Sequence, residues 1–400
     1  MKKLIGFGLV LLFLQGTSAA DDLRETIEYG KVSLDARYRF EFVDQDGLDN
    51  NATASTLRLR LGYTTKDFYG FHLHLDLETI HVVGFGDYNS TDNGKIEYPV
   101  VADPDDTELN QAYLDYTGIA NFAFRLGRQK IILDNARFIG NVGWRQNEQT
   151  FDAFKFVNTS LQDFTFILSY FSRVNRIFGA HHSRLSHIDL DAFVFHVNYK
   201  FFLGGLSAYA HFFDNNNNPD NSHQNFGLRF AGNYGIADDI TVLYALELAT
   251  QHDYEQGSEF IRATYRFLEL GCNWTRFTAK VGYEVLGGDG KYGFSTPFAT
   301  LHAFNGWADK FLATPLNGIQ DIYFLAGANL EVLQRPLVLK LVYHDFRSDN
   351  DSIRYGSELD VMAQMTVLER LDVLLKFAGY NADSHASDTT KFWVSLHYRF

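Results

Sequence analysis

The chain has 400 residues, with 35 Lys and Arg against 49 Asp and Glu, so its formal net charge is −14 at pH 7. An acidic chain of this kind lacks the basic footprint of a nucleic-acid-binding protein. Its single cysteine, Cys272, excludes an intrachain disulfide and gives no support to a thiolate metal cluster. Aromatic residues are abundant, with 37 Phe and 22 Tyr, and the scarcity of proline (6 residues) also favours β-strands.

The first twenty residues predict an export signal. Lys2 and Lys3 precede an uncharged stretch at 4–14, and the small residues before Asp21 suit cleavage after Ala20. The uncharged stretch is shorter than the ~20 residues that a bilayer-spanning helix needs. We therefore predict a signal peptide over residues 1–20 and a single domain over residues 21–400 that lies beyond the inner membrane.

From residue 31 onward, apolar and polar residues alternate in one segment after another. The stretch KVSLDARYRFEF at 31–42 is the first, and LRLRLGYT at 57–64 and FHLHLDLE at 71–78 repeat it. A period of two places successive side chains on opposite faces of a sheet. Eighteen strands are predicted on this basis, at 31–42, 57–64, 71–78, 109–117, 122–132, 150–158, 163–173, 189–199, 205–213, 224–233, 239–249, 259–272, 276–286, 320–330, 337–347, 355–366, 371–380 and 390–400.

The connections between these strands are alternately short and long. This alternation, with strands near the ~9–11 residues of a tilted membrane strand, predicts an all-β transmembrane antiparallel barrel with short periplasmic turns and long extracellular loops. A soluble β-sandwich is the alternative, which the signal sequence and the two loop classes disfavour. The barrel must close, so the last strand pairs with the first, and Tyr398 and Phe400 are expected in an aromatic girdle at the periplasmic side. We therefore place the protein in the bacterial outer membrane.

Two segments break the regular alternation. In 259–272 the apolar positions change face after Phe267, which predicts a bulge. On this interpretation Arg262 and Arg266 point inward. In the segment 122–132, Gly127 suggests a similar slip that would reorient Arg128.

A barrel of eighteen strands is wide enough for an aqueous channel. If the apolar faces meet lipid, the inward faces carry more cations than anions. The inward cations include Arg37, Arg58, Arg60, Arg229, Lys340 and Lys376. Rings of Arg and Lys select anions in pores. The alternative is that mixed charges hydrate the lumen and pair with one another across strands. No cofactor and no metal site is predicted.

The connection within 133–153 combines an aromatic plane with guanidinium and amide groups. These groups belong to Arg137, Trp144, Arg145, Gln146 and Asn147. Such groups hold sugars and carboxylates in binding sites. The alternative is a loop whose Trp144 anchors at the membrane interface.

Three long stretches, at 127–153, 284–323 and 344–360, resemble the alginate-export family of outer-membrane barrels. The resemblance implies an eighteen-stranded monomeric barrel that conducts an anionic polysaccharide, such as alginate, or a related solute by passive diffusion. The inward-facing Asp76 and Glu78 depart from a strongly cationic conduit. The resemblance therefore supports the channel more than the substrate.

The resemblance also implies which segment and which residues narrow the pore. It makes the segment 287–319 a candidate for a loop that folds inward or acts as a lid. It makes four arginines candidates for the constriction, namely Arg125, Arg128, Arg137 and Arg145.

Other functions remain as alternatives. A general or nutrient-uptake porin would lack anion preference. A membrane-embedded hydrolase is disfavoured because the sequence contains no nucleophile elbow and no H-E-x-x-H motif. A loop-based adhesin could bind divalent cations through the acidic runs at 103–106 and 348–352, although solvated loop charge is the favoured explanation of these runs. The expected partners are outer-membrane lipid and lipopolysaccharide, the assembly machinery through the C-terminal strand, and an anionic solute or polysaccharide.

Overall fold

The computed structural model describes the backbone of residues 17–400 and the side chains of residues 21–400. One helix, α1 (Thr17–Glu28), precedes the strands, and the connections contain the short 3-10 helices η1 (Pro219–Asn221) and η2 (Leu301–Ala303). The strands are β1 (Lys31–Gln45), β2 (Ala52–Thr64), β3 (Phe71–Asp87), β4 (Asp106–Tyr116), β5 (Phe122–Gln129), β6 (Thr150–Asn158), β7 (Phe164–Asn175), β8 (His187–Phe201), β9 (Gly204–Asn215), β10 (His223–Ala237), β11 (Ile240–Asp253), β12 (Arg262–Trp274), β13 (Phe277–Leu286), β14 (Ile319–Val332), β15 (Arg335–Arg347), β16 (Arg354–Leu368), β17 (Leu371–Ala382) and β18 (Thr389–Arg399).

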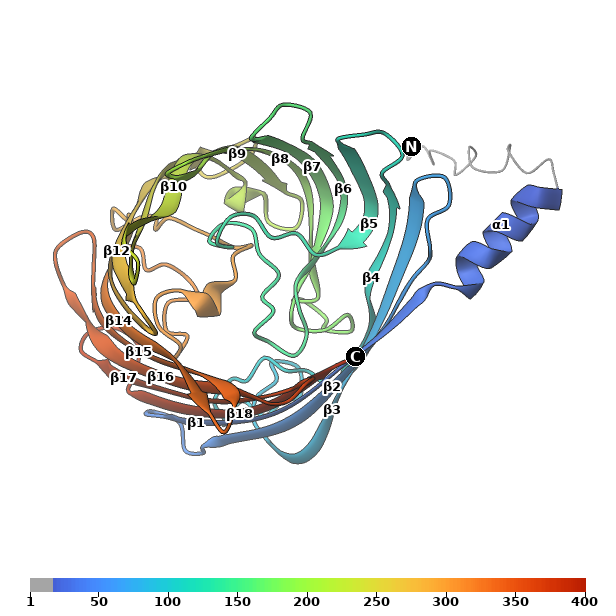
Figure 1. Cartoon of the computed structure of the whole chain (residues 1–400). Coiled ribbons are helices and arrows are strands. Elements are labelled where there is room, and N and C mark those ends of the chain that lie inside the picture. Colours follow the sequence, from blue (N-terminus) through green and yellow to red (C-terminus); the bar gives the residue numbers. More distant parts are fainter. Residues whose placement is uncertain (1–16) are drawn as a thin grey trace.

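These strands form one antiparallel sheet that closes into a barrel (Figure 1). Each strand pairs with its neighbour in sequence, and β18 pairs with β1, with Leu396 opposite Tyr38. The backbones of Leu34 and Phe400 exchange two hydrogen bonds, at 3.0 and 2.8 Å. The eighteen predicted strands and the predicted closure of the barrel are confirmed.

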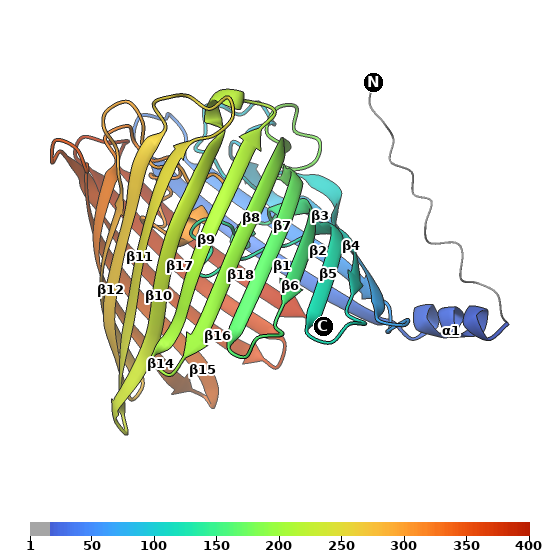
Figure 2. The same cartoon turned by 90° about the horizontal axis from the view of Figure 1, so that it is seen from above.

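The two ends of the barrel differ (Figure 2). One end, which we call the turn end, carries the C-terminus and the short connections, such as 117–121 and 202–203. The other end, the loop end, carries the long connections. Among residues 17–400, no helix combines the length and the apolar character needed to cross a membrane. The predicted signal peptide falls mostly outside the described residues and stays a prediction, as does cleavage after Ala20.

The alternation of the sequence becomes a difference between the two faces of the wall. On β2, Leu59 and Leu61 are exposed on the outside of the barrel. Arg58 and Arg60, which alternate with them along the strand, are buried inside. Outward leucine, valine and aromatic side chains on most strands repeat this arrangement. An apolar outer face and a polar inner face are what a barrel needs in lipid.

The predicted bulge in the segment 259–272 is wrong. The pairing of β12 with β11 and with β13 runs through Phe267 and Leu268 without a shift. Consequently Tyr265 faces inward and is 1% exposed, whereas Arg262 and Arg266 face outward. The physical reason is that the lumen beside β12 is filled by apolar side chains, so an inward tyrosine has packing partners there.

Candidate functional site

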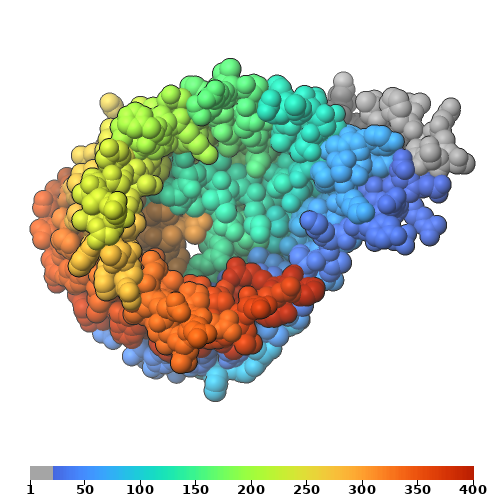
Figure 3. Space-filling view, viewed as in Figure 1, coloured from blue at the N-terminus to red at the C-terminus, as the bar shows by residue number. Residues whose placement is uncertain are grey.

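Three connections from the loop end reach into the lumen, two of them along most of their length and the first with its last residues. They are residues 88–105 between β3 and β4, residues 130–149 between β5 and β6, and residues 287–318 between β13 and β14. The second and third are joined by a short parallel bridge between Ile139 and Phe298. The space-filling view along the barrel shows only a small gap near the centre (Figure 3). The inward fold expected of the third connection is confirmed.

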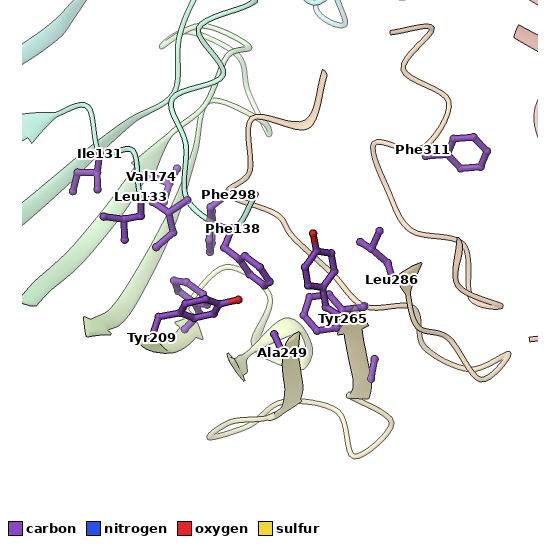
Figure 4. Packing of buried hydrophobic residues seen from close by; sticks show 14 of the residues in the cluster. Ile131, Leu133, Phe138, Val174, Tyr209, Ala249, Tyr265, Leu286, Phe298 and Phe311 are labelled. Atoms are coloured by element: carbon purple, nitrogen blue, oxygen red, sulfur yellow. The ribbon is translucent and has the colours of Figure 1, made fainter. Parts of the chain in front are cut away.

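On the side of β8 to β13, these connections pack into an apolar cluster (Figure 4). The ring of Phe138 lies with its centroid 5.2 Å from that of Tyr209 and 5.4 Å from that of Tyr265. Phe294 is fully buried and lies 5.8 Å from both Phe138 and Tyr265. Inward aromatic residues of the wall therefore hold the 130–149 and 287–318 connections by packing.

On the side of β1 and β18, the same two connections are held by charge. Arg145 donates to Glu41 of β1 at 3.1 Å and to Asp309 of the 287–318 connection at 3.0 Å. Lys391 of β18 donates to the same Asp309 oxygen at 3.0 Å. Burial opposes the charge on Asp309, but Lys391, His302 and Arg145 outweigh it and hold the pKa of that carboxyl well below its usual range. The carboxylate is therefore charged inside the lumen.

The acidic run at 103–106 contributes to this charged side. Asp103 is fully buried, accepts from the backbone N–H of Gln146 at 2.9 Å and pairs with Arg39 at 3.4 Å. Burial opposes its charge, yet Arg39 and Arg145 prevail and lower the pKa of Asp103. The expectation that Asp103 is a solvated loop charge is wrong, because the 88–105 connection turns back into the lumen.

Three tryptophans surround one buried lysine at the centre of the charged side. The ammonium nitrogen of Lys376 lies 3.6 Å from the ring centroid of Trp307, 4.1 Å from that of Trp144 and 5.5 Å from that of Trp393. It also donates to Nε2 of His302 at 2.6 Å. Burial and the Lys376 charge hold the pKa of His302 well below its usual range. The imidazole is therefore neutral, and its Nε2 is free to accept this bond. We call this group the tryptophan cluster.

A cavity of about 510 Å³ lies between the tryptophan cluster and the turn end. Its lining includes five Lys and Arg side chains, Arg37, Arg39, Lys340, Lys376 and Arg399. Arg39 is paired with Asp103, and Arg399 with Asp372. Arg37 donates only to amide and carbonyl oxygens, and within residues 21–400 neither it nor Lys340 nor Lys376 has a carboxylate partner. Unpaired charge near apolar surface is costly, so the cavity favours an anion.

Most of the arginines predicted to line the pore face the lumen but are already paired with carboxylates. The pairs are Arg58 with Asp35 at 2.5 Å, Arg60 with Glu148 at 2.9 Å, Arg125 with Asp115 at 2.6 Å, Arg137 with Glu284 at 2.7 Å and Arg229 with Glu247 at 2.8 Å. At these positions the interpretation of mixed, mutually paired charge fits the structure. Around the cavity, where Lys340 lies, the interpretation of anion preference fits.

The loop residues that were expected to bind a solute serve first to attach their own loop. Gln146 is fully buried, and its Oε1 accepts from Nε of Arg37 at 2.9 Å. Asn147 is buried to the same degree. The alternative in which Trp144 anchors at the membrane interface is wrong, because its ring stacks on His302 at 4.4 Å inside the lumen.

Arg128 does not reach the constriction. The pairing of β5 with β4 and with β6 runs through Gly127 without a shift, which leaves Arg128 on the outer face with Leu126, paired with Asp152 at 2.8 Å. The predicted slip is therefore wrong. Gly127 has a φ of +125°, and a Cβ there would lie 2.3 Å from the carbonyl oxygen of Ala112. Glycine is required for this close approach rather than for a change of register.

The sequence singled out Trp144 and Lys340 but not the other residues that shape the cavity. The alternation of the sequence predicted that Arg37 and Lys376 point inward, and this was the signal by which they could have been identified as cavity residues. His302, Trp307 and Asp309 lie on an irregular connection whose side-chain directions no periodicity predicts. Within residues 21–400, no group of three or more His, Cys, Asp or Glu side chains is placed to hold a metal ion.

The chain is similar to known proteins in sequence and in fold. Residues 28–291 match the sequence model of the family described as alginate export. No curated protein matches the chain. Among solved structures, OpdK of Pseudomonas aeruginosa, crystallised with vanillate, is similar with a TM-score of 0.73 and 13% identity, covering 94% of this chain and 99% of that chain.

Two further solved structures are similar in the same way. OccAB2 of Acinetobacter baumannii has a TM-score of 0.72 and 14% identity over 94% of this chain and 99% of that chain. OccK2 (OpdF) of P. aeruginosa, in complex with glucuronate, has a TM-score of 0.68 and 12% identity, again over 94% and 99%. At these identities the likeness establishes the barrel fold.

Proposed function

Because this chain belongs to the alginate export family of outer-membrane β-barrels, we propose that it is a channel for the passive passage of anionic solutes, including a polysaccharide such as alginate. In the outer membrane the turn end faces the periplasm and the loop end faces the exterior. Solutes on the periplasmic side therefore meet the 510 Å³ cavity first.

The observation that carries this proposal is the set of cations around that cavity. Arg37, Lys340 and Lys376 lie on its surface, and none has a carboxylate partner within residues 21–400. Lysine and arginine rings in a pore raise the local potential and enrich anions. The rings of Trp144 and Trp307 beside them offer flat apolar surface to a sugar or another ring.

The solved structures support a carboxylate as the favoured anion. Vanillate accompanies OpdK and glucuronate accompanies OccK2, and each of these ligands carries one carboxylate. A general porin without anion preference is a second candidate. It is favoured by the five inward arginines that already pair with carboxylates, since paired charges largely cancel at a distance.

Reversal potentials in planar bilayers under asymmetric salt decide between the two candidates. An anion-selective channel blocked by added glucuronate is the expected result. Equal permeability to both ions would favour the general porin, and a cation-selective channel would contradict both the anion preference and the role of the cavity.

The proposal includes partners for the barrel wall. The apolar outer face contacts outer-membrane lipid and lipopolysaccharide, and the barrel acts as a monomer without catalysis. The closing strand is recognised by the assembly machinery.

Phe400→Asp should reduce barrel insertion, because it alters the end of the closing strand. Heat-modifiable gel mobility of membrane fractions measures this, and unchanged levels of folded barrel would count against the role of Phe400.

A further inference from the structure

The carboxylate of Asp309 occupies a complete anion site inside the lumen. One oxygen accepts from Arg145 and from Lys391, both at 3.0 Å, and the other accepts from Nδ1 of His302 at 2.7 Å. The four side chains are at most 7% exposed. Charge-assisted hydrogen bonds to both oxygens from three directions are how a protein binds a carboxylate ligand.

Two of the three donors of this site have a second partner besides Asp309. Arg145 is fixed by Glu41 of β1 at 3.1 Å. Lys391 projects from the regular strand β18, and the remaining nitrogen of His302 accepts from Lys376. Donors oriented by a second set of contacts keep their geometry when the ligand leaves. The site is therefore built by the wall, the 130–149 connection and His302 of the 287–318 connection, with Asp309 as its removable part.

Charge around the site also favours a replacement anion. Arg145 and Lys391 both pair with Asp309, and within residues 21–400 Glu41 is the one other carboxylate that pairs with either of them. Without Asp309, one carboxylate would face these two cations. Buried cations left without a partner strongly favour the binding of another anion.

The segment that carries Asp309 contains two residues with left-handed backbone. Asn305 and Asp309 have φ of +54° and +62°, in a region that non-glycine residues rarely adopt and that Asn and Asp tolerate better than most. Contacts with the wall maintain it, since Glu358 and Asp360 accept from the N–H groups of the residues before Asp309, at 2.6 and 3.2 Å. Strain of this kind clusters at ligand clamps and switch segments.

The site is one side chain away from the solute cavity. His302 binds Asp309 through Nδ1 and lines the 510 Å³ cavity, together with Trp144 and Lys376. A carboxylate that enters the cavity between these rings thus lies next to the donors that hold Asp309.

We propose that Asp309 is a tethered stand-in for the carboxylate of the solute. The site made by Arg145, Lys391 and His302 takes a carboxylate from the solute, which displaces Asp309 and releases the segment 305–309 from the lumen. The inference rests on the proposed function, because it presumes that carboxylate solutes enter the cavity. A tethered competitor lowers the apparent affinity for the solute by the fraction of time that it occupies the site.

The test uses full-length barrels in planar bilayers, with glucuronate as the probe. Asp309→Asn removes the competing charge and keeps a residue that tolerates left-handed backbone. It should lower the glucuronate concentration for half-block ~tenfold and raise the conductance without solute. Asp309→Gly, which relieves the strain, should do the same and covers the case in which the Asn variant does not fold. Asp309→Asn combined with Lys391→Gln should lose the gain, because the site then lacks a donor.

A matched control comes from the same connection. Asp289→Asn changes an exposed carboxylate that accepts only backbone N–H groups of its own turn, and it should behave as the wild type. Unchanged or weaker block in folded Asp309→Asn and Asp309→Gly barrels would overturn the inference. Wild-type reversal potentials separate this failure from that of the proposed function, because an anion-selective wild type with unresponsive Asp309 variants would leave the channel proposal intact.

Discussion

The two sides of the lumen hold the same connections by different physics. Beside β8 to β13, Phe138 and Phe294 pack against wall aromatics, with one buried ion pair, Arg137 with Glu284, beside them. Beside β1 and β18, Arg145, Asp309 and Lys391 hold the connections through ion pairs. Apolar packing is not directional, and no solute anion competes with it. Ion pairs exchange partners when another anion arrives.

This difference separates a fixed part of the lumen from a responsive part. The apolar cluster determines where the two connections lie, and the charged side determines which solutes interact with them. The 510 Å³ cavity and the tryptophan cluster lie on the charged side, where a change of ligand can alter the contacts. The comparison predicts that substitutions on the apolar side alter stability and pore size together, while substitutions on the charged side alter selectivity.

The largest effect is expected on the apolar side. Phe294→Ala removes a fully buried ring from the centre of the cluster, which costs ~3–5 kcal/mol for a buried phenylalanine. The two connections should loosen, so single-channel conductance should rise and the temperature of the gel-mobility transition should fall. Phe202→Ala, at an exposed position of the turn end, serves as the control. A normal conductance in Phe294→Ala would mean that the charged side alone holds the connections.

A smaller effect, on selectivity, is expected on the charged side. Lys340→Gln with Lys376→Gln removes two cations of the cavity that have no carboxylate partner within residues 21–400. The anion-to-cation permeability ratio should fall roughly two- to fivefold at low salt, and the difference should vanish near ~1 M salt, where the Debye length is ~3 Å.

A paired site provides the control for that measurement. Arg125→Gln with Asp115→Asn removes an inward ion pair whose members lie 2.6 Å apart, so the net charge of the wall does not change. The ratio should stay at the wild-type value. If the paired site shifted selectivity as much as the two lysines did, the distinction between paired and unpaired cations would be wrong.

The smallest effect concerns pH. Burial, followed by the repulsion of Lys391, lowers the pKa of Lys310 to about 8. Its side chain carries a positive charge below that pH and is neutral above it, so anion preference should decline slightly between pH 7 and pH 9. Lys310→Gln should remove this step, as measured by reversal potentials at both pH values. A decline of equal size in the variant would assign the titration to another group.

The wall of the barrel could be predicted because its physics is local. An alternating segment such as 31–42 presents one apolar face, and lipid outside and water inside decide which face is which. The rule fails at β12, where Tyr265 faces inward because a loop residue, Phe138, is there to receive it. At Arg128 the rule holds, and the predicted slip was wrong because Gly127 is needed for a close approach to Ala112. In both cases the deciding contact comes from another element of the fold.

The sequence by itself determined the eighteen strands, the alternation of short and long connections and the inward direction of Arg37, Lys340 and Lys376, because a period of two is a property of each strand alone. Only the tertiary structure decided which inward cations have carboxylate partners. Pairing depends on distances between different strands and connections, as with Arg145 and Asp309, which are 164 positions apart. Only the cations without a carboxylate partner remain available to a solute in the lumen. The tertiary structure determines which cations these are.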